Sequence, residues 1–207
     1  MIDEGVIKFE SRWRKSAPIR HPAVHELIRW RRPLYDAGLI GCYPDSGIGY
    51  GNLSARVEPP DLFVISGSGT GCIADPGPAD FSLVTRCDVG RNIVESTGAV
   101  EASSESMTHA ALYELDPGIR AVVHVHSKAM WSALGESLPA TAAGVAYGTP
   151  EMAREFRRLL AGTAFRQTGV AVMAGHAEGL VSVGHSVREA TERLLDLQRD
   201  VLPPAPG

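Results

Sequence analysis

AVVHVHS, at residues 121–127, is rich in β-branched side chains and therefore predicts a β-strand. Residues two positions apart on a strand point to the same face, so His124 and His126 share one face while Val123 and Val125 share the other. Two neutral imidazoles at this spacing can bind one metal ion, and a third ligand would complete the open site typical of catalytic zinc. Two histidines that form hydrogen bonds at a sheet edge are the simpler alternative, and the pair alone does not decide between them.

Helical and strand patterns alternate on both sides of this segment. Apolar spacing, capping residues and glycine or proline breaks predict helices at 21–37, 104–115, 127–134, 149–160 and 186–201, and strands within 47–57, 62–71, 169–174 and 179–184. We expect Pro33 to end or kink the first helix, and Thr149 and Pro150 to cap and begin the fourth. The tail LPPAPG reads as a disordered end. The pattern predicts a layered α/β fold with a sheet of mostly short strands.

The composition is that of an ordinary globular protein of 207 residues, 44% hydrophobic and 21% charged, with a formal net charge of −4. No basic stripe is present, which argues against nucleic acid as a partner but leaves a small anionic ligand open. No apolar run approaches the ~18 residues that span a bilayer, and the first residues lack the pattern of a signal peptide. We therefore expect no membrane association and a cytoplasmic location.

The cysteines Cys42, Cys72 and Cys87 are odd in number, scattered and not in CxxC spacing. This pattern argues against a disulfide framework and against a cysteine zinc site. We expect all three to be small core residues.

Further polar residues stand at positions suited to a site. His176 ends the apolar run GVAVMAGH and precedes GLVSVG, which places it in a turn between two strands, where either a ligand or a simple turn residue is expected. Glu105 opens the predicted helix at 104–115, where it is either an acid/base or a carboxylate stabilised by the helix dipole. Ser103 and Ser104 have a capping alternative. The loop GSGTG can bind an anion through backbone amides, or serve only as a turn.

Taken in order, GNLSAR, ISGSG, SSE at a helix start, AVVHVHS and a later histidine before VSVG resemble the class II aldolase/adducin family, which includes fuculose-phosphate aldolases and ribulose-phosphate 4-epimerase. The resemblance spans roughly residues 38–190. It implies one α/β/α domain over residues 1–207, built around a mixed, mostly antiparallel sheet.

The resemblance also implies a site and a chemistry. His124, His126 and His176 match the metal ligands, Glu105 matches the acid/base, and the substrate-phosphate pocket is matched by Asn52, Ser68, Gly69, Ser103 and Ser104. The metal is expected to be zinc, with iron(II), manganese and cobalt as alternatives. The implied reaction is an aldolase-type lyase reaction that cleaves a C–C bond of a small hydroxy-carbonyl compound, such as a sugar phosphate, through a metal-stabilised enediolate. A homo-oligomer, a tetramer in many family members, is implied as well.

The sequence departs from the family pattern in three places. Two extra residues follow His176 before the next strand, so that Glu178 is a candidate to face the site. The region 138–149 is shortened and lacks the segment that carries a catalytic tyrosine, and Tyr147 is not a confident substitute. The chain also ends soon after its last helix, without a longer C-terminal tail.

Three other functions compete with the lyase. A 4-epimerase uses the same bond cleavage but needs proton-handling groups on both faces of the substrate, which the sequence does not identify. A relative with iron(II) on the same histidines would carry out redox chemistry. An adducin-like interaction module would keep the fold without the metal, but a scaffold has no need of His124, His126, His176 and Glu105 together.

Overall fold

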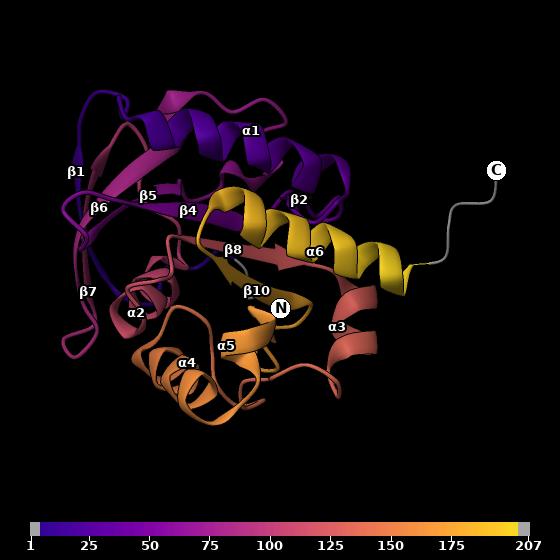
Figure 1. Cartoon of the computed structure of the whole chain (residues 1–207). Coiled ribbons are helices and arrows are strands. Elements are labelled where there is room, and N and C mark those ends of the chain that lie inside the picture. The colour runs from indigo at the N-terminus through magenta and orange to yellow at the C-terminus, as the bar shows by residue number, and fades with distance from the viewer. Residues whose placement is uncertain (1–4, 203–207) are drawn as a thin grey trace.

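The computed structural model describes residues 5–202, in which an eight-stranded mixed sheet lies between two layers of helices (Figure 1). The strand order is β1-β7-β6-β5-β4-β8-β10-β9; β1 pairs in parallel with β7, and the other neighbours are antiparallel. The strands are β1 (Glu10–Lys15), β4 (Asn52–Val57), β5 (Leu62–Ser66), β6 (Phe81–Asp88), β7 (Ile93–Gly98), β8 (Ala121–His126), β9 (Val170–Val172) and β10 (Gly179–Gly184). The predicted α/β/α class and the mixed, mostly antiparallel sheet are confirmed.

The helices divide between the two faces of the sheet. One face is covered by α1 (Pro22–Asp36) and α6 (Val187–Val201), and the other by α2 (Ser106–Leu115), α4 (Pro150–Gly162) and α5 (Phe165–Thr168), while α3 (Lys128–Leu134) packs beside α6 (Figure 1). The side chains of Ser127, Thr149 and Ser186 accept a hydrogen bond from the first turn of α3, α4 and α6. These N-caps begin the helices where the sequence predicts, because each satisfies an amide that has no partner within the helix.

Strand β8 lies between β4 and β10 and is buried along its whole length. Val123 and Val125 pack into the apolar cluster under α1 and α6, whereas Val122 packs into the cluster under α2 and α4. The side chains of β8 therefore alternate between two cores, and His124 and His126 share the α2 side with Val122.

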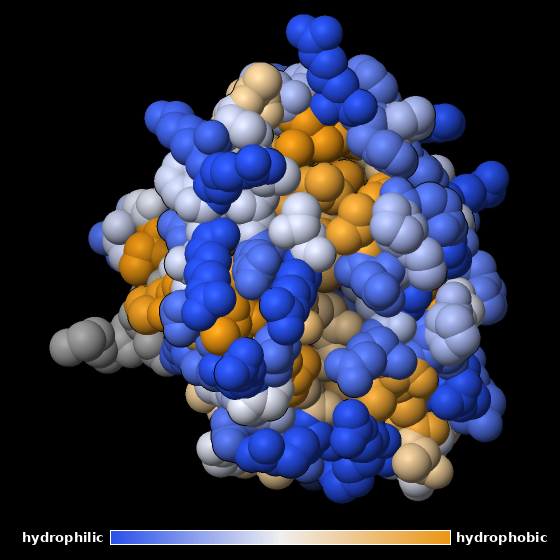
Figure 2. Space-filling view, turned by 90° about the vertical axis from the view of Figure 1, so that its left-hand side faces the viewer, coloured by the Kyte–Doolittle hydropathy of each residue, from blue (hydrophilic) through white to orange (hydrophobic). Residues whose placement is uncertain are grey.

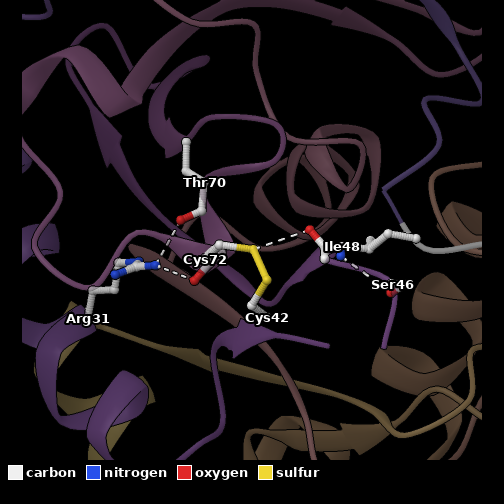
Figure 3. The surroundings of a disulfide bond; sticks show 8 residues. Arg31, Cys42, Ser46, Ile48, Thr70 and Cys72 are labelled. Carbon is white, nitrogen blue, oxygen red and sulfur yellow. Dashed lines mark hydrogen bonds between the residues drawn. A yellow bond between two sulfur atoms is a disulfide. The ribbon is translucent and has the colours of Figure 1, made fainter. Parts of the chain in front are cut away.

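Two expectations about single residues need correction. Of the end or kink predicted at Pro33, the end is wrong, because the first helix continues to Asp36, and the kink stays a prediction. Pro33 lies in the last turn, so only the hydrogen bond to the Arg29 carbonyl is lost, and Arg29 is exposed and can be solvated. Separately, Cys42 and Cys72 form a disulfide with a Cα–Cα distance of 4.5 Å (Figure 3).

The disulfide joins two segments that sequence spacing does not relate. Cys42 ends the short strand β2 (Gly41–Cys42), which pairs with β3 (Gly49–Tyr50), and Cys72 ends the 3₁₀ turn η1 (Thr70–Cys72), packed against this hairpin. A second 3₁₀ turn, η2 (Pro78–Asp80), precedes β6. Cys87 is a free, half-buried thiol, and burial raises its pKa to about 12.

The surface on the β1 side is mainly hydrophilic, with separate hydrophobic patches between the polar side chains (Figure 2). Within residues 5–202, no helix is both long and apolar enough to cross a bilayer. Most of the predicted disordered tail, residues 203–207, lies outside the described residues. That residues 1–207 form a single domain stays a prediction.

Candidate metal centre

The two histidines of β8 point to the same face of the sheet, as the strand pattern predicts. Their Nε2 atoms are 3.0 Å apart, and both side chains are buried. Since β8 is an interior strand, the alternative of two histidines at a sheet edge is wrong.

His176 brings the third imidazole from the turn between β9 and β10. Its backbone amide donates to Met173, and its carbonyl accepts from the amide of Gly179, so the turn is closed on both sides of the histidine. The His176 Nε2 atom lies 3.0 Å from Nε2 of His126. A Cβ atom at position 179 would lie 2.6 Å from the His176 ring and 3.2 Å from His124, so glycine is required for the rings to converge.

The outer nitrogens of two of these rings have hydrogen-bond partners. His124 Nδ1 lies 3.1 Å from the carbonyl oxygen of Leu180, and His126 Nδ1 lies 2.8 Å from the hydroxyl of Tyr43. The Tyr43 hydroxyl donates to Glu178 Oε2 over 3.2 Å. Contacts of this kind fix the ring orientation and the tautomer of a metal-ligating histidine.

The donor set fits a divalent metal ion. A carbonyl can only accept, so His124 carries its proton on Nδ1 and presents a lone pair at Nε2. Burial, and then the neighbouring His126 and His176, lower the pKa of His124 well below its usual value, which keeps the ring neutral. The three ligand atoms lie within 4.8 Å of one another. A bound cation would satisfy converging lone pairs that otherwise repel, and three imidazoles suit zinc and other transition metals.

Glu105 places a carboxylate beside the three histidines. It is the N-cap residue of α2 rather than a first-turn residue, it is fully buried, and its side chain makes no capping hydrogen bond. Its Oε1 atom lies 3.6 Å from Nε2 of His176 and 3.8 Å from Nε2 of His124. The carboxylate is therefore oriented toward the imidazoles, as an acid/base beside a metal would be.

The structure brings together the segments that carry the predicted anion pocket. Asn52 pairs in register with His124, and its buried Oδ1 atom has no hydrogen-bond partner among residues 5–202. Beyond the end of β5, the Ser68 amide donates to the carbonyl of Glu101, next to the buried Ser103 and Ser104. An unpartnered buried amide oxygen is costly, which is consistent with a ligand near Asn52.

Two of the predicted pocket residues, Ser103 and Gly69, have a structural role that needs no ligand. Ser103 Oγ accepts a hydrogen bond from the Glu105 amide, which is the capping-type contact given above as its alternative. Gly69 is exposed with a φ of 72°, which its lack of a side chain permits. The roles of all five predicted pocket residues stay predictions.

Glu178 and Tyr147, named above where the sequence departs from the family pattern, both contact residues in or around the histidine cluster. Glu178 does face the site, but through Tyr43, and it holds a left-handed φ of 67° that is rare outside glycine. The Tyr147 ring packs 4.4 Å from the ring of His176, while its hydroxyl bonds to both backbone groups of Val6, at 3.0 and 3.1 Å.

Sequence reasoning missed Tyr43 and Gly179. Tyr43 lies in a loop more than 80 residues before its partner His126, and no local pattern relates the two. The signal for Gly179 was its place at the start of the strand that follows His176.

The sequence and the fold match a known family of proteins. The profile of the Class II Aldolase and Adducin N-terminal domain matches residues 45–200, and the chain belongs to that family. The family is dependent on divalent metals, and its members are generally enzymes; the three-histidine cluster of this chain is compatible with metal binding.

Solved structures share the fold at low sequence identity. A putative aldolase/epimerase/decarboxylase, YgbL from Klebsiella pneumoniae, is 20% identical, with a TM-score of 0.64 and 86% of each chain covered. The l-fuculose-1-phosphate aldolase from Thermus thermophilus is 22% identical, with a TM-score of 0.63 over 88% of this chain and 92% of the other. A sugar-phosphate aldolase from Thermotoga maritima is 15% identical, with a TM-score of 0.65 over 86% of this chain and 91% of the other.

Proposed function

We propose that this chain is a metal-dependent lyase that cleaves a C–C bond in a small hydroxy-carbonyl compound with an anionic group. The observation that carries the proposal is the buried Glu105 carboxylate, 3.6 Å and 3.8 Å from two of three converging imidazoles. The Glu105 side chain lies toward the imidazoles and makes no capping hydrogen bond to α2.

Each group of site residues has its own role in the proposed reaction. His124, His126 and His176 would hold the ion, which supplies a Lewis acid for the oxygen that gains negative charge as the bond breaks. Cleavage requires a proton to leave the substrate hydroxyl and another to reach the carbon that keeps the electron pair, and Glu105 would hold and move such a proton. Asn52, Ser68, Gly69, Ser103 and Ser104 would bind the anionic group.

Several finer points belong to the same proposal. Zinc is the proposed metal because three neutral imidazoles match its preference, and a sugar phosphate is the proposed substrate because aldolases of known fold that resemble the chain act on such compounds. We also propose a homo-oligomer. A cytoplasmic location remains a prediction, and the Cys42–Cys72 disulfide speaks against it, since disulfides are rare in reducing compartments.

The test is a screen of zinc-loaded protein against a panel of ketose and pentulose phosphates, with aldehyde release as the readout. We expect at least one substrate whose cleavage is abolished by chelator and restored by zinc, and slowed in Glu105→Gln. Interconversion of epimers without aldehyde release would replace the lyase by a 4-epimerase. No turnover of any panel member by protein with full zinc content would contradict the proposal.

A further inference from the structure

The loop of residues 67–72, here called the glycine loop, is held in place by two contacts with other parts of the protein, a buried arginine and a disulfide bond. It follows β5, carries Ser68 and Gly69, and ends in η1. Within the loop, the Thr70 hydroxyl and amide both bond to the carbonyl of Gly67. Such local bonds shape a turn but do not fix its position on the protein.

The first anchor is a buried guanidinium. Arg31 of α1 is 1% exposed and donates to the carbonyls of Thr70 and Gly71, both at 3.0 Å (Figure 3). It also donates to the carbonyl of Ile73 at 2.6 Å. The planar guanidinium presents its N–H donors in a fixed fork, and a lysine ammonium does not reproduce that geometry.

The charge of Arg31 has no close counter-ion. Among residues 5–202 no carboxylate lies within 4 Å of it, so it contacts only neutral groups: the three carbonyls and the ring of Tyr35, 5.3 Å away. Burial lowers the pKa of Arg31, and electrostatic interactions with Tyr35 and Asp80 partly oppose this. A buried cation without a contact carboxylate is costly, and an anion bound at the loop above it would reduce that cost.

The second anchor is the disulfide. Cys72 of the glycine loop is joined to Cys42 of the β2–β3 hairpin (Figure 3). The two segments meet backbone to backbone, because a Cβ at Gly71 would lie 2.6 Å from the Gly41 carbonyl oxygen and a Cβ at Gly49 would lie 2.9 Å from the Gly71 amide. Both cysteines are half-buried, so a small reductant can reach the bond.

The same hairpin supports the metal centre. Tyr43 follows Cys42 directly and contacts His126 Nδ1. The disulfide therefore links the loop expected to bind the anion with a residue that orients a metal ligand. The three histidines themselves lie on β8 and on the β9–β10 turn, outside both linked segments.

We propose that Arg31 and the Cys42–Cys72 disulfide are positioning elements that hold the glycine loop in an anion-accepting shape, so that reduction of the disulfide weakens anion binding while the metal is retained. This proposal rests on the proposed function, because it deepens the anionic part of the substrate. The redox step is an exchange with a dithiol: the dithiol loses two electrons and two protons and closes to a cyclic disulfide, and Cys42 and Cys72 become two thiols.

The probe is inorganic phosphate, titrated by calorimetry into the zinc-loaded full chain. The oxidised protein is compared with protein reduced by a dithiol and then exchanged into oxygen-free buffer, and with the double variant Cys42→Ser, Cys72→Ser. A preorganised loop binds more tightly because ordering is not required on binding, so we expect phosphate affinity to fall on the order of three- to tenfold in both. Cys87→Ser is the control for cysteine loss and should respond to the dithiol as the wild type does.

The arginine anchor is tested with a matched neighbour. Arg32 is exposed and pairs with Asp36 and Asp75, so Arg32→Met should leave phosphate affinity unchanged. Arg31→Met should lower it on the order of tenfold through loss of a nearby charge, and Arg31→Lys, which keeps the charge but not the fork, should recover part of that loss. A purely structural role for Arg31 would lower the melting temperature of both Arg31 variants without this recovery in phosphate affinity.

The outcomes separate the two proposals. Equal phosphate affinity in the oxidised, reduced and double-serine proteins would overturn the redox part, as would the finding of free thiols at Cys42 and Cys72 in the purified protein. If Arg31→Met does not fold, equal affinity in Arg31→Lys and wild type overturns the arginine part. Phosphate binding that depends on the disulfide, in a protein that cleaves nothing, would support this inference while contradicting the lyase.

Discussion

The contact between Tyr43 and His126 gives a quantitative prediction for metal binding. If an ion binds at Nε2 of His126, the Nδ1–H group donates to the Tyr43 hydroxyl over 2.8 Å, and that hydroxyl donates to Glu178 over 3.2 Å. The carboxylate thereby polarises the tyrosine and makes the imidazole a better ligand. Tyr43→Phe removes this chain of contacts while it keeps the ring and the packing.

The size of the effect follows from comparable contacts. Loss of a hydrogen-bond partner behind a ligating histidine lowers metal affinity about 10- to 100-fold, or about 1.4–2.7 kcal/mol. The same deletion should reduce the free energy of unfolding of the metal-free protein by only about 1 kcal/mol, since Tyr43 is half-buried.

The assay is competition for zinc between the protein and a chromogenic chelator at pH 7.5. Tyr50→Phe is the matched control: its ring lies 5.6 Å from the ring of His126, but its hydroxyl donates to the carbonyl of Gly38. We expect wild-type affinity for Tyr50→Phe and a 10- to 100-fold loss for Tyr43→Phe. Affinities of the two variants within a factor of two of each other would refute the assignment of Tyr43 as a support of His126.

Two further predictions concern buried ionisable groups on α2. Glu105→Gln should keep metal content and melting temperature near wild type and reduce the cleavage rate by about 10²–10⁴, as expected for an acid/base; near-normal turnover would move the proton-handling role to another group. Burial lowers the pKa of His109 from 6.5 to about 3, so below pH 6.5 the unfolded chain binds a proton that the folded chain excludes, and stability falls as the pH falls. Between pH 7 and pH 5 the difference in unfolding free energy between wild type and His109→Asn should change by about 2 kcal/mol in favour of the variant, as measured by urea titration; a constant difference would show that His109 titrates normally.

Local sequence signals predicted the five longest helices and the strands β4, β5, β8, β9 and β10, because these signals depend on neighbours in the chain. They predicted no strand at β1, β6 or β7 and no helix at α5. The strand at 121–126 follows from its β-branched residues, and the helix starts follow from Ser127, Thr149 and Ser186, each of which caps an amide of its own first turn. The common face of His124 and His126 is likewise a property of one strand.

The remaining features depend on contacts between distant segments. Cys42 and Cys72 are 30 residues apart and are brought together by the packing of a hairpin on a 3₁₀ turn, which cysteine spacing does not encode. Arg31 carried a weak signal, because it stands in the buried stripe of Val24, Leu27 and Leu34 on α1. The orientation of Glu105 toward the histidines required the tertiary structure, since the sequence pattern alone favoured a helix-dipole role for this carboxylate.

The central claim is that His124, His126 and His176 together bind one divalent ion, and a zinc titration of chelator-treated protein tests it most directly. We predict about one ion per chain for the wild type, with His124→Ala, His126→Ala and His176→Ala each losing most of the occupancy at equal free zinc. Circular dichroism of each variant checks that the fold persists. Full occupancy in His176→Ala would show that another group, first of all Glu178, replaces it, and no zinc binding by folded wild-type protein would contradict the claim itself.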